Sequence, residues 1–453
     1  MVKNYNDIAH EIDLLTSVSI HGVVANLVGM LVEITGLHGS LSVGDLVRIQ
    51  GRYGNQVRAE VVGFRAGRAL VMPFGSLDGV GMGCKTELVA TDPSIYPCDE
   101  WLGRVINAFA EPADDKGILP KGKIAYPIHN PPPQAHGRRR VGHKIDLGVR
   151  AMNAFLTCCR GQRMGIFAGS GVGKSALLSM MARNTDAEVN VVGLIGERGR
   201  EAREFLEDTL GESGLKRSII IVATSDEPAL TRRQAAYVTM AVAEYFRNQG
   251  KNVLCLMDSV TRFAMAQREI GLSAGEPPAS KGYTPSVFSE LPKLLERAGP
   301  GEKCQGDITG LFTVLVEGDN HNEPVADAVR GILDGHVVLD RQIAERGRFP
   351  AINVLRSVSR TMPNCNTENQ NIAVNRARQL LATYEDMAEL IRLGAYRQGS
   401  DNNIDEAIFY YPQLESFLSQ GLSDKSNLEE GYQALYRMFN IESPPETNTD
   451  EHS

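Results

Sequence analysis

Eight residues near the middle of the chain decide its fold: Ala168-Gly169-Ser170-Gly171-Val172-Gly173-Lys174-Ser175. The apolar-leaning run Met164 to Phe167 precedes them, and a helical pattern from Ala176 to Arg183 follows. A strand, a glycine loop and a helix start form the phosphate-binding loop of an NTPase, in which backbone N–H groups turn toward an anion. Position 168 carries Ala where the usual motif has Gly, but the Lys-Ser offset favours a phosphate loop over a chance glycine-rich turn.

This loop supplies the first candidate site residues. Lys174 is placed to reach the outer phosphates of a nucleotide, and the Ser175 hydroxyl is placed to ligate Mg²⁺. The predicted nucleotide-binding residues are Gly169, Ser170, Gly171, Val172, Gly173, Lys174, Ser175 and Ala176.

The composition is that of a globular protein with several domains. The 453 residues predict two to four domains, and 42% hydrophobic with 23% charged residues is ordinary for such a protein. A formal net charge of −8 argues against a nucleic-acid partner, which favours a basic face. The seven cysteines show no zinc spacing and are expected to be reduced. No apolar run approaches about 20 residues and no signal peptide is recognised, so we expect a cytoplasmic protein.

The chain divides into five predicted segments. Residues 1–18 form a short amphipathic helix that docks on a partner or on the protein itself, and residues 19–93 form a small antiparallel β-barrel, indicated by short apolar runs broken by glycine. Only Phe64 and Phe74 are placed as base-stacking aromatics, so a structural barrel is favoured. Residues 94–370 form an ATPase domain, residues 371–440 a helical domain, and residues 441–453 a disordered acidic tail.

Strands and helices alternate after the phosphate loop, which predicts an α/β domain whose mostly parallel sheet is covered on both faces. The expected strands are Asn190–Gly196, Ser218–Ala223, Asn252–Asp258 and Gly310–Glu317. The expected helices are Ile145–Cys159, Arg233–Gln249 and Arg376–Leu393, with a last helix that begins at a capping box of Ser426 and Glu429.

Two polar stretches leave alternatives open. The basic run Arg138–Arg140 suits nucleic acid or a membrane surface, but a solvated charge cluster is commoner. Glu197 follows an apolar strand, where a carboxylate can polarise an attacking water, and Arg198 can stabilise charge on a transferred phosphoryl group. Taken alone, the sequence from Glu197 to Glu201 is also an ordinary charged loop.

Asp258 ends a continuous apolar strand, where its carboxylate can hold the Mg²⁺ shell opposite Ser175. Such an aspartate can instead cap the next helix, but the phosphate loop upstream favours the magnesium role.

Four stretches together resemble the rotary ATP synthase superfamily. They are the phosphate loop, Gly196–Glu201, Leu256–Arg262 and Pro350–Arg360, the last with a Pro-Ala-hydrophobic-Asn and then Ser-x-Ser-Arg pattern. Within that superfamily the chain most resembles the ATPases of type III protein export in their flagellar form. The supporting stretches are Gly282–Phe288 with Leu291-Pro292, Val316–Asp319 with Asn322–Pro324, and Ile332–His336.

The resemblance implies a central RecA-like P-loop NTPase domain and roles for single residues. Lys174 and Ser175 would hold phosphates and Mg²⁺, Glu197 would activate water, and Arg198 would contact the γ-phosphate of ATP. Asp258 would support the metal, and Arg360 would be an arginine finger that enters the neighbouring subunit's site. Phe349 stands where relatives often carry an adenine-stacking Tyr, and its ring keeps that ability.

The resemblance also implies an activity and partners. We expect a Mg²⁺-dependent ATP hydrolase that energises type III export of flagellar components as a homo-hexameric ring with sites at subunit interfaces. Expected partners are a regulatory stalk protein at the N-terminus, export-gate and stalk-like components, chaperone–substrate complexes at the C-terminal helices and, peripherally, the export machinery at the inner membrane. No specific nucleic acid is expected.

Four other functions remain as alternatives. A virulence-type secretion ATPase shares every catalytic motif. A rotary ATP synthase catalytic subunit would carry a carboxylate-rich loop where Leu393–Gly399 has none. A non-catalytic nucleotide-binding subunit would lack Glu197. An RNA translocase would need aromatics in the barrel and a basic pore, and ranks last.

Overall fold

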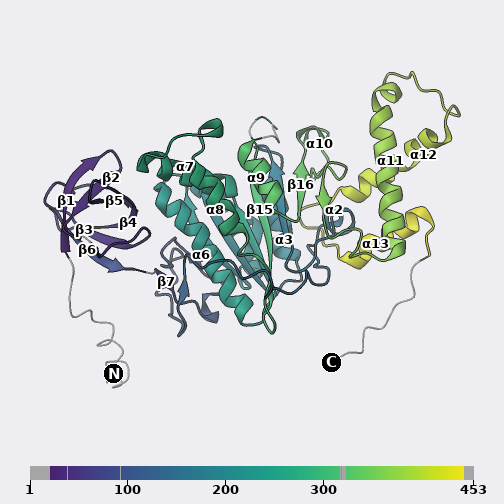
Figure 1. Cartoon of the computed structure of the whole chain (residues 1–453). Helices are drawn as coiled ribbons and strands as arrows, with labels where there is room; N and C mark the ends of the chain where they lie inside the picture. Colours follow the sequence, from purple (N-terminus) through teal and green to yellow (C-terminus); the bar gives the residue numbers. More distant parts are fainter. Residues whose placement is uncertain (1–20, 38, 92, 317, 319–322, 443–453) are drawn as a thin grey trace.

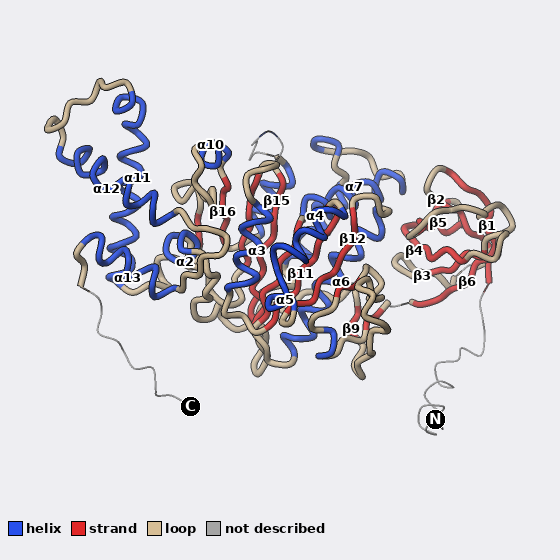
Figure 2. The backbone as a smooth tube through the Cα atoms, turned by 180° about the vertical axis from the view of Figure 1, so that it is seen from behind, coloured by secondary structure: helices blue, strands red, loops and turns tan. Residues whose placement is uncertain are grey.

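The chain folds into three parts that follow one another along an elongated molecule: a β-barrel, a central sheet with helices on both faces, and a group of C-terminal helices (Figures 1 and 2). The structure is a computed structural model, and it describes residues 21–37, 39–91, 93–316, 318 and 323–442. The predicted helix at residues 1–18 and all but two residues of the predicted acidic tail lie outside these ranges. No helix in the described ranges is long and apolar enough to cross a membrane.

The barrel is closed by six antiparallel strands in the order β1-β2-β5-β4-β3-β6. Alternate residues point inward, as in β3, where Val47 and Ile49 are buried between half-buried neighbours. This confirms the predicted barrel. Phe64 is exposed on its surface, whereas Phe74 is buried and meets Phe109 of the central domain edge-on. The strands are β1 (His21–Val28), β2 (Leu31–Thr35), β3 (Leu46–Gln50), β4 (Gln56–Arg65), β5 (Arg68–Pro73) and β6 (Lys85–Ala90).

The central sheet has the order β17-β16-β10-β15-β13-β11-β12-β8, with β14 paired to β15, and confirms the predicted parallel architecture. All neighbours are parallel except β17 against β16 and β14 against β15. The strands are β8 (Val105–Ile106), β10 (Arg163–Ala168), β11 (Val189–Glu197), β12 (Ser218–Thr224), β13 (Val253–Asp258), β14 (Gly299–Pro300), β15 (Asp307–Leu315), β16 (Gly335–Leu339) and β17 (Val358–Ser359), and a separate pair joins β7 (Ser94–Ile95) to β9 (Tyr126–Pro127).

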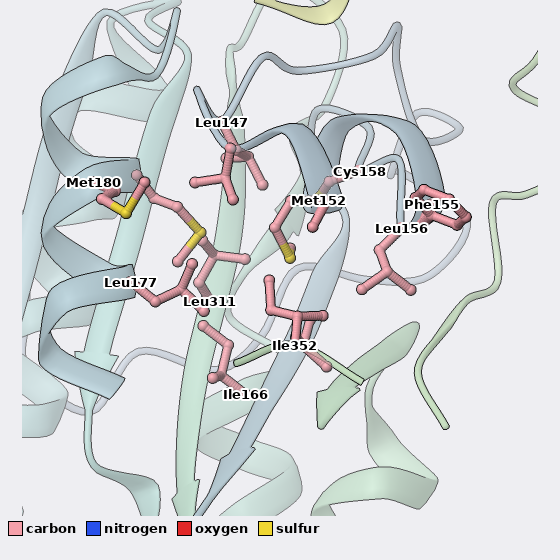
Figure 3. Packing of buried hydrophobic residues seen from close by; sticks show 14 of the residues in the cluster. Leu147, Met152, Phe155, Leu156, Cys158, Ile166, Leu177, Met180, Leu311 and Ile352 are labelled. Atoms are coloured by element: carbon pink, nitrogen blue, oxygen red, sulfur yellow. The ribbon is translucent and has the colours of Figure 1, made fainter. Parts of the chain in front are cut away.

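Helices bury both faces of this sheet, which is why its strands are continuously apolar. Ile166 and Leu311 face Leu177 of α3, as Figure 3 shows, whereas Phe167 belongs to the apolar cluster of the opposite face. One face carries α2 (Arg150–Phe155) and α3 (Lys174–Asn184), and the other carries α6 (Ala229–Asn248), α7 (Val260–Ala274), α8 (Pro285–Leu295) and α9 (Pro324–Ile332). Shorter helices are α4 (Gly199–Glu204), α5 (Gly211–Leu215) and α10 (Arg341–Glu345), with a π-helical stretch at Phe205–Leu210.

The helix predicted over Ile145–Cys159 is wrong in extent, because only α2 within it is helical. Gly148 adopts a left-handed φ of 69° before the helix, and the segment then turns back on itself after Leu156. Ile145 N–H donates to the Cys158 carbonyl at 2.9 Å, which pairs the two ends of the predicted helix side by side.

The C-terminal part contains α11 (Glu368–Arg392), α12 (Asn402–Leu418) and α13 (Leu428–Phe439). α11 begins eight residues before the predicted start, at a capping box formed by Thr367 and Gln370. The last helix is capped by Asn427 and Glu430, one residue later than the predicted Ser426 and Glu429. Thus the sequence predicts that a capping box begins the last helix, but it places the box one residue too early.

The barrel docks on the central domain through an apolar contact and a buried ion pair. Leu31, Met72 and Phe74 of the barrel cluster with Ala229, Leu230, Ala266 and Ile270 of α6 and α7. Beside them, Arg233 of α6 bonds both carboxylate oxygens of Glu60 at 2.5 Å, and these side chains are only 11% and 5% exposed. The barrel and the nucleotide domain are therefore held together by a desolvated interface.

Candidate nucleotide-binding and catalytic site

The phosphate loop joins the carboxyl end of β10 to the start of α3. Gly171 and Gly173 have φ values of 79° and 92°, in the left-handed region that glycine enters without strain. Gly173 is the residue before α3, and no side chain caps the helix there. The first N–H groups of α3 therefore point into the loop, where a phosphate can accept their hydrogen bonds.

Lys174, Glu197 and Asp258 come together at this edge of the sheet because each stands at or just after the carboxyl end of a parallel strand. Lys174 Nζ lies 3.1 Å from Glu197 Oε1 and contacts Asp258 Oδ1 directly. Between their strands lies β15, whose Thr313 hydroxyl donates to Asp258 Oδ1 at 2.7 Å. The structure thus brings three of the predicted site residues into one cluster.

Charge pairing in this cluster outweighs desolvation for the lysine. Burial alone lowers the pKa of Lys174, but Asp258 and Glu197 raise it above its usual value, so the ammonium stays charged. Burial raises the pKa of Asp258 above its usual range, and the ammonium of Lys174 opposes that rise. A charged lysine is suited to bind the outer phosphates of a nucleotide.

Phe349 lies beside the phosphate loop although it is distant in sequence. A Cβ atom placed on Gly173 would be 3.4 Å from Cδ1 of the Phe349 ring, and Phe349 is 46% exposed. On the same side, Arg341 of α10 donates to the Ser170 carbonyl at 3.0 Å. A half-open aromatic face next to the loop is a suitable surface for stacking a base.

Arg198 is at the same edge but does not join the cluster. Its side chain is 75% exposed and pairs with Glu201 at 3.6 Å, one turn into α4. An exposed pair of this kind contributes roughly 0–1 kcal/mol, so Arg198 is readily available to another anion.

Arg360 lies at the opposite edge of the sheet from the phosphate loop of its own chain. It follows β17, in which Ser359 pairs with Gly335 at the start of β16, and β16 runs parallel to β10. The six residues of β10 separate the two edges by about 20 Å. The exposed Arg360 therefore cannot serve the site built around Lys174 of the same chain.

The basic run is not a solvated cluster as a whole. Arg138 donates to the carbonyls of Pro133, Ala298 and Glu296, and Arg139 donates to Asp307 Oδ1 at 2.7 Å. These two arginines tie their loop to the central domain; Arg138 is half-buried, whereas Arg139 and Arg140 are exposed to solvent.

Sequence reasoning missed Thr313 and Arg341. Thr313 is a fully buried polar residue in the mainly apolar strand β15, and a hydroxyl in such a strand is itself a signal of a buried hydrogen bond. Arg341 carried no such signal, because an arginine in the first turn of a short surface helix is common.

Two oxygen donors at the site suit Mg²⁺. They are the exposed Ser175 hydroxyl and Asp258 Oδ2, which forms no hydrogen bond with any residue in the described ranges. The described part of the chain has no group of three or more His, Cys, Asp or Glu side chains able to hold a metal ion. Few protein ligands are typical of Mg²⁺ bound together with nucleotide phosphates.

This fold and this site define a P-loop ATPase of the ATP synthase alpha/beta class. The model of the ATP synthase alpha/beta family nucleotide-binding domain matches residues 148–359, and the family's beta-barrel domain matches residues 24–87. The T3SS EscN ATPase C-terminal domain matches residues 366–437. The chain belongs to the flagellum-specific ATP synthase family, and it is an ATP-hydrolysing enzyme, as the resemblance implied.

Several proteins are similar to this chain over almost their whole length. The "Flagellum-specific ATP synthase" of Caulobacter vibrioides is 58% identical over 95% of this chain and 98% of its own, and that of Bacillus subtilis is 51% identical over 94% and 96%. The "Type 3 secretion system ATPase" of Xanthomonas euvesicatoria is 46% identical over 92% and 93%. The assembled ATPase EscN from enteropathogenic E. coli has a TM-score of 0.87 at 41% identity, covering 92% of this chain and 99% of EscN.

Proposed function

We propose that this protein is a Mg²⁺-dependent ATP hydrolase that energises type III export of flagellar components from catalytic sites shared between neighbouring subunits. The observation that carries the proposal is that Arg360 lies far from the nucleotide site of its own chain. Lys174, Glu197 and Asp258 converge at one edge of the sheet, while Arg360 lies at the other. Flagellar rather than virulence-type export is supported by the identity of 58% and 51% to two flagellum-specific relatives, against 46% to the type 3 secretion ATPase.

The phosphate loop and Lys174 bind ATP in this proposal. The N–H groups of residues 169–176 cradle the phosphates, and Lys174 exchanges its carboxylate partners for the β- and γ-phosphates. That exchange frees Glu197 to accept a hydrogen bond from the attacking water and orient it toward the γ-phosphate. Arg198, held only by its exposed pair with Glu201, turns to the γ-phosphate, and Phe349 stacks on the adenine.

Ser175 and Asp258 would hold Mg²⁺ with the phosphates. When bound, the ion neutralises charge that develops on the phosphoryl oxygens. The Thr313 hydroxyl fixes the orientation of Asp258 by bonding its Oδ1, and Oδ2 forms no hydrogen bond with any described residue.

Arg360 acts in the neighbouring subunit's site in this proposal, which requires a closed ring. A head-to-tail interface that places Arg360 of one chain against Lys174 of the next closes by rotation, and a homo-hexamer is the expected ring. Support comes from the solved structure of assembled EscN, to which this chain is similar over 92% of its length.

The remaining partners follow from the same family. EscN has been solved in complex with its central stalk EscO, with a TM-score of 0.84 to this chain, which supports a stalk partner here. We place regulatory stalk binding at residues 1–18 and chaperone–substrate complexes at the C-terminal helices. We also propose a cytoplasmic protein that contacts export-gate components and the inner-membrane machinery peripherally.

Subunit mixing tests this function. ATP hydrolysis per chain is measured for wild type, Glu197→Gln and Arg360→Ala, and for an equal mixture of the two variants, with particle mass measured alongside. Each variant alone should lose activity by roughly 10³-fold or more, because every site lacks one essential group. In random mixed rings roughly a quarter of the interfaces join an intact Glu197 to an intact Arg360, so activity should return toward a quarter of the wild-type rate.

A mixture as inactive as either variant would overturn the shared site. Wild-type activity in Arg360→Ala would contradict the proposed role of Arg360 as an arginine finger. No hydrolysis by the wild-type ring with Mg²⁺ would contradict the proposed catalytic function.

A further inference from the structure

Gln162 is a fully buried amide that occupies the turn before β10. Its Nε2 donates to the Asp334 carbonyl and to Ser359 Oγ, both at 3.0 Å. Its Oε1 accepts from Cys159 N–H at 2.9 Å and from Thr361 Oγ1 at 3.0 Å. An amide side chain has two donors and two acceptor lone pairs, so this side chain is completely satisfied.

Three of these bonds converge on the segment that carries Arg360. Ser359 and Thr361 are the residues on either side of Arg360. The Asp334 carbonyl that Gln162 contacts also accepts the backbone N–H of Arg360 at 3.0 Å. Gln162 therefore bonds the residue before Arg360, the residue after Arg360, and the carbonyl that accepts the backbone N–H of Arg360.

Further hydrogen bonds hold the residues that Gln162 contacts, and we call this set of bonds around Gln162 the clamp. Ser359 Oγ also donates to the Thr157 carbonyl at 2.8 Å, and Thr361 Oγ1 lies 3.2 Å from the same carbonyl and 3.0 Å from Ser359 Oγ. Asp334 is fixed by Arg163, which pairs with its carboxylate at 3.0 Å and 3.2 Å. The Arg360 side chain itself is exposed, so its direction is set by the backbone from which it projects.

We propose that Gln162 is a positioning residue for the arginine finger: its amide orients Arg360 toward the neighbouring subunit's γ-phosphate. The inference rests on the proposed role of Arg360. Gln162 directly precedes β10, and the phosphate loop directly follows β10. A single strand therefore connects the nucleotide site of a chain to the residue that positions the same chain's Arg360. Replacement by an apolar residue leaves several buried polar groups without partners and releases the segment.

Gln162→Met keeps the length of the side chain and removes the hydrogen bonds of the amide. We expect kcat for ATP hydrolysis to fall roughly 10- to 100-fold, since a shift of about 1 Å in a catalytic group has that effect. KM for ATP should change less than about threefold, and the ring mass should not change, because the chain's own phosphate loop is untouched. The matched control is Gln234→Leu, which removes another buried glutamine that donates to the Ala108 carbonyl, far from Arg360.

Two readouts separate positioning from a general structural role. In the Arg360→Ala background, Gln162→Met should lower kcat no further, because its effect passes through the missing arginine. Mixed with Glu197→Gln chains, Gln162→Met chains should regain activity as Arg360→Ala chains do, because the defect lies on the face offered to the neighbour. Ser359→Ala, which removes one bond of the clamp, provides a milder variant if Gln162→Met does not assemble.

Equal losses of kcat in the wild-type and Arg360→Ala backgrounds, or no recovery in mixed rings, would overturn the positioning role while leaving the arginine finger intact. An Arg360→Ala ring with wild-type activity would instead overturn the finger itself, so the two failures are distinguishable.

Discussion

Cys159 and Cys365 are a thiol pair that joins the turn before β10 to the segment leading into α11. A hydrogen bond from the Cys159 thiol is the largest influence on Cys365 and lowers its pKa to about 6, with further lowering by Thr361 and by the ammonium of Lys144 and with burial opposing. The same pairing raises the pKa of Cys159. All seven cysteines are free, in agreement with the expected reduced state, so Cys365 is available as a thiolate.

Alkylation of Cys365 should therefore show the pH profile of an acidic thiol. Because its pKa is lowered from 9.0 to about 6, the thiolate predominates above pH 6, and the rate of iodoacetamide labelling at this position should be half-maximal near that pH. Peptide mass spectrometry at a series of pH values measures the rate. Cys159→Ala removes the hydrogen bond and should move the half-maximal pH upward. A profile of the wild type that still rises steeply at pH 8 would contradict the pairing.

Single residues were predictable where their partners are local in sequence. Lys174 and Ser175 belong to one contiguous motif, and Asp258 ends an apolar strand, so spacing alone identifies them. Glu197 needed the family resemblance, because a charged loop after a strand has no unique meaning. The long-range partners of Gln162, Thr313 and Arg341 could not be predicted, since they are 55 to 199 residues distant and only the folded chain presents them.

The start of α13 shows how finely an element boundary is set. Asn427 and Glu430 form the capping box, whereas Ser426 and Glu429 offer the same residue types one position earlier. The side chain of Asn427 accepts from Glu430 N–H at 2.8 Å, and Glu430 Oε2 accepts from Asn427 N–H at 3.1 Å. Burial of Tyr432, Leu435 and Tyr436 fixes the register, which the local pattern cannot decide.

Asn427→Ala should destabilise the C-terminal part by about 1 kcal/mol, because the first turn of α13 loses its cap. Ser426→Ala, one residue away, is the matched control. It should change the free energy of unfolding much less than Asn427→Ala does, by no more than a few tenths of the change in that variant. Urea denaturation followed by circular dichroism compares the two. A larger effect of Ser426→Ala would move the cap back to the position that the sequence suggested.

Elements were predicted well where apolar runs are long and poorly where the chain reverses direction. The strands β11, β12, β13 and β15 lie within a few residues of their predicted limits, since each is a run of mainly apolar residues. The prediction of a helix over Ile145–Cys159 was wrong because the chain reverses direction within this segment. Its apolar residues are buried on the two sides of that reversal and do not form one face of a helix. Periodicity does not distinguish these two ways of burying the same residues.

For the whole molecule, the ion pair between Glu60 and Arg233 controls how firmly the barrel is attached. Glu60→Ala leaves a buried guanidinium without its partner and should destabilise barrel docking by about 3–5 kcal/mol. Limited proteolysis of the segment between barrel and sheet, at increasing urea, measures the docking. Arg58→Ala is the control at the same interface, because its pair with Glu111 is about half exposed and contributes roughly 0–1 kcal/mol.

The double variant Glu60→Leu with Arg233→Met should recover most of the loss, because two apolar side chains remove both buried charges. Equal proteolysis of Glu60→Ala and Arg58→Ala would show that the apolar contact alone carries the docking.

The same ion pair has a consequence for synthesis of the chain. Its two residues are 173 positions apart, so at about 5–20 residues per second the ribosome adds Arg233 about 9 to 35 s after Glu60. During that interval Leu31, Met72 and Phe74 face water beside an unpaired Glu60. The carboxylate that is buried in the finished protein thus acts first as a solubilising charge on the nascent barrel, and it discourages other apolar surfaces from docking where α6 belongs.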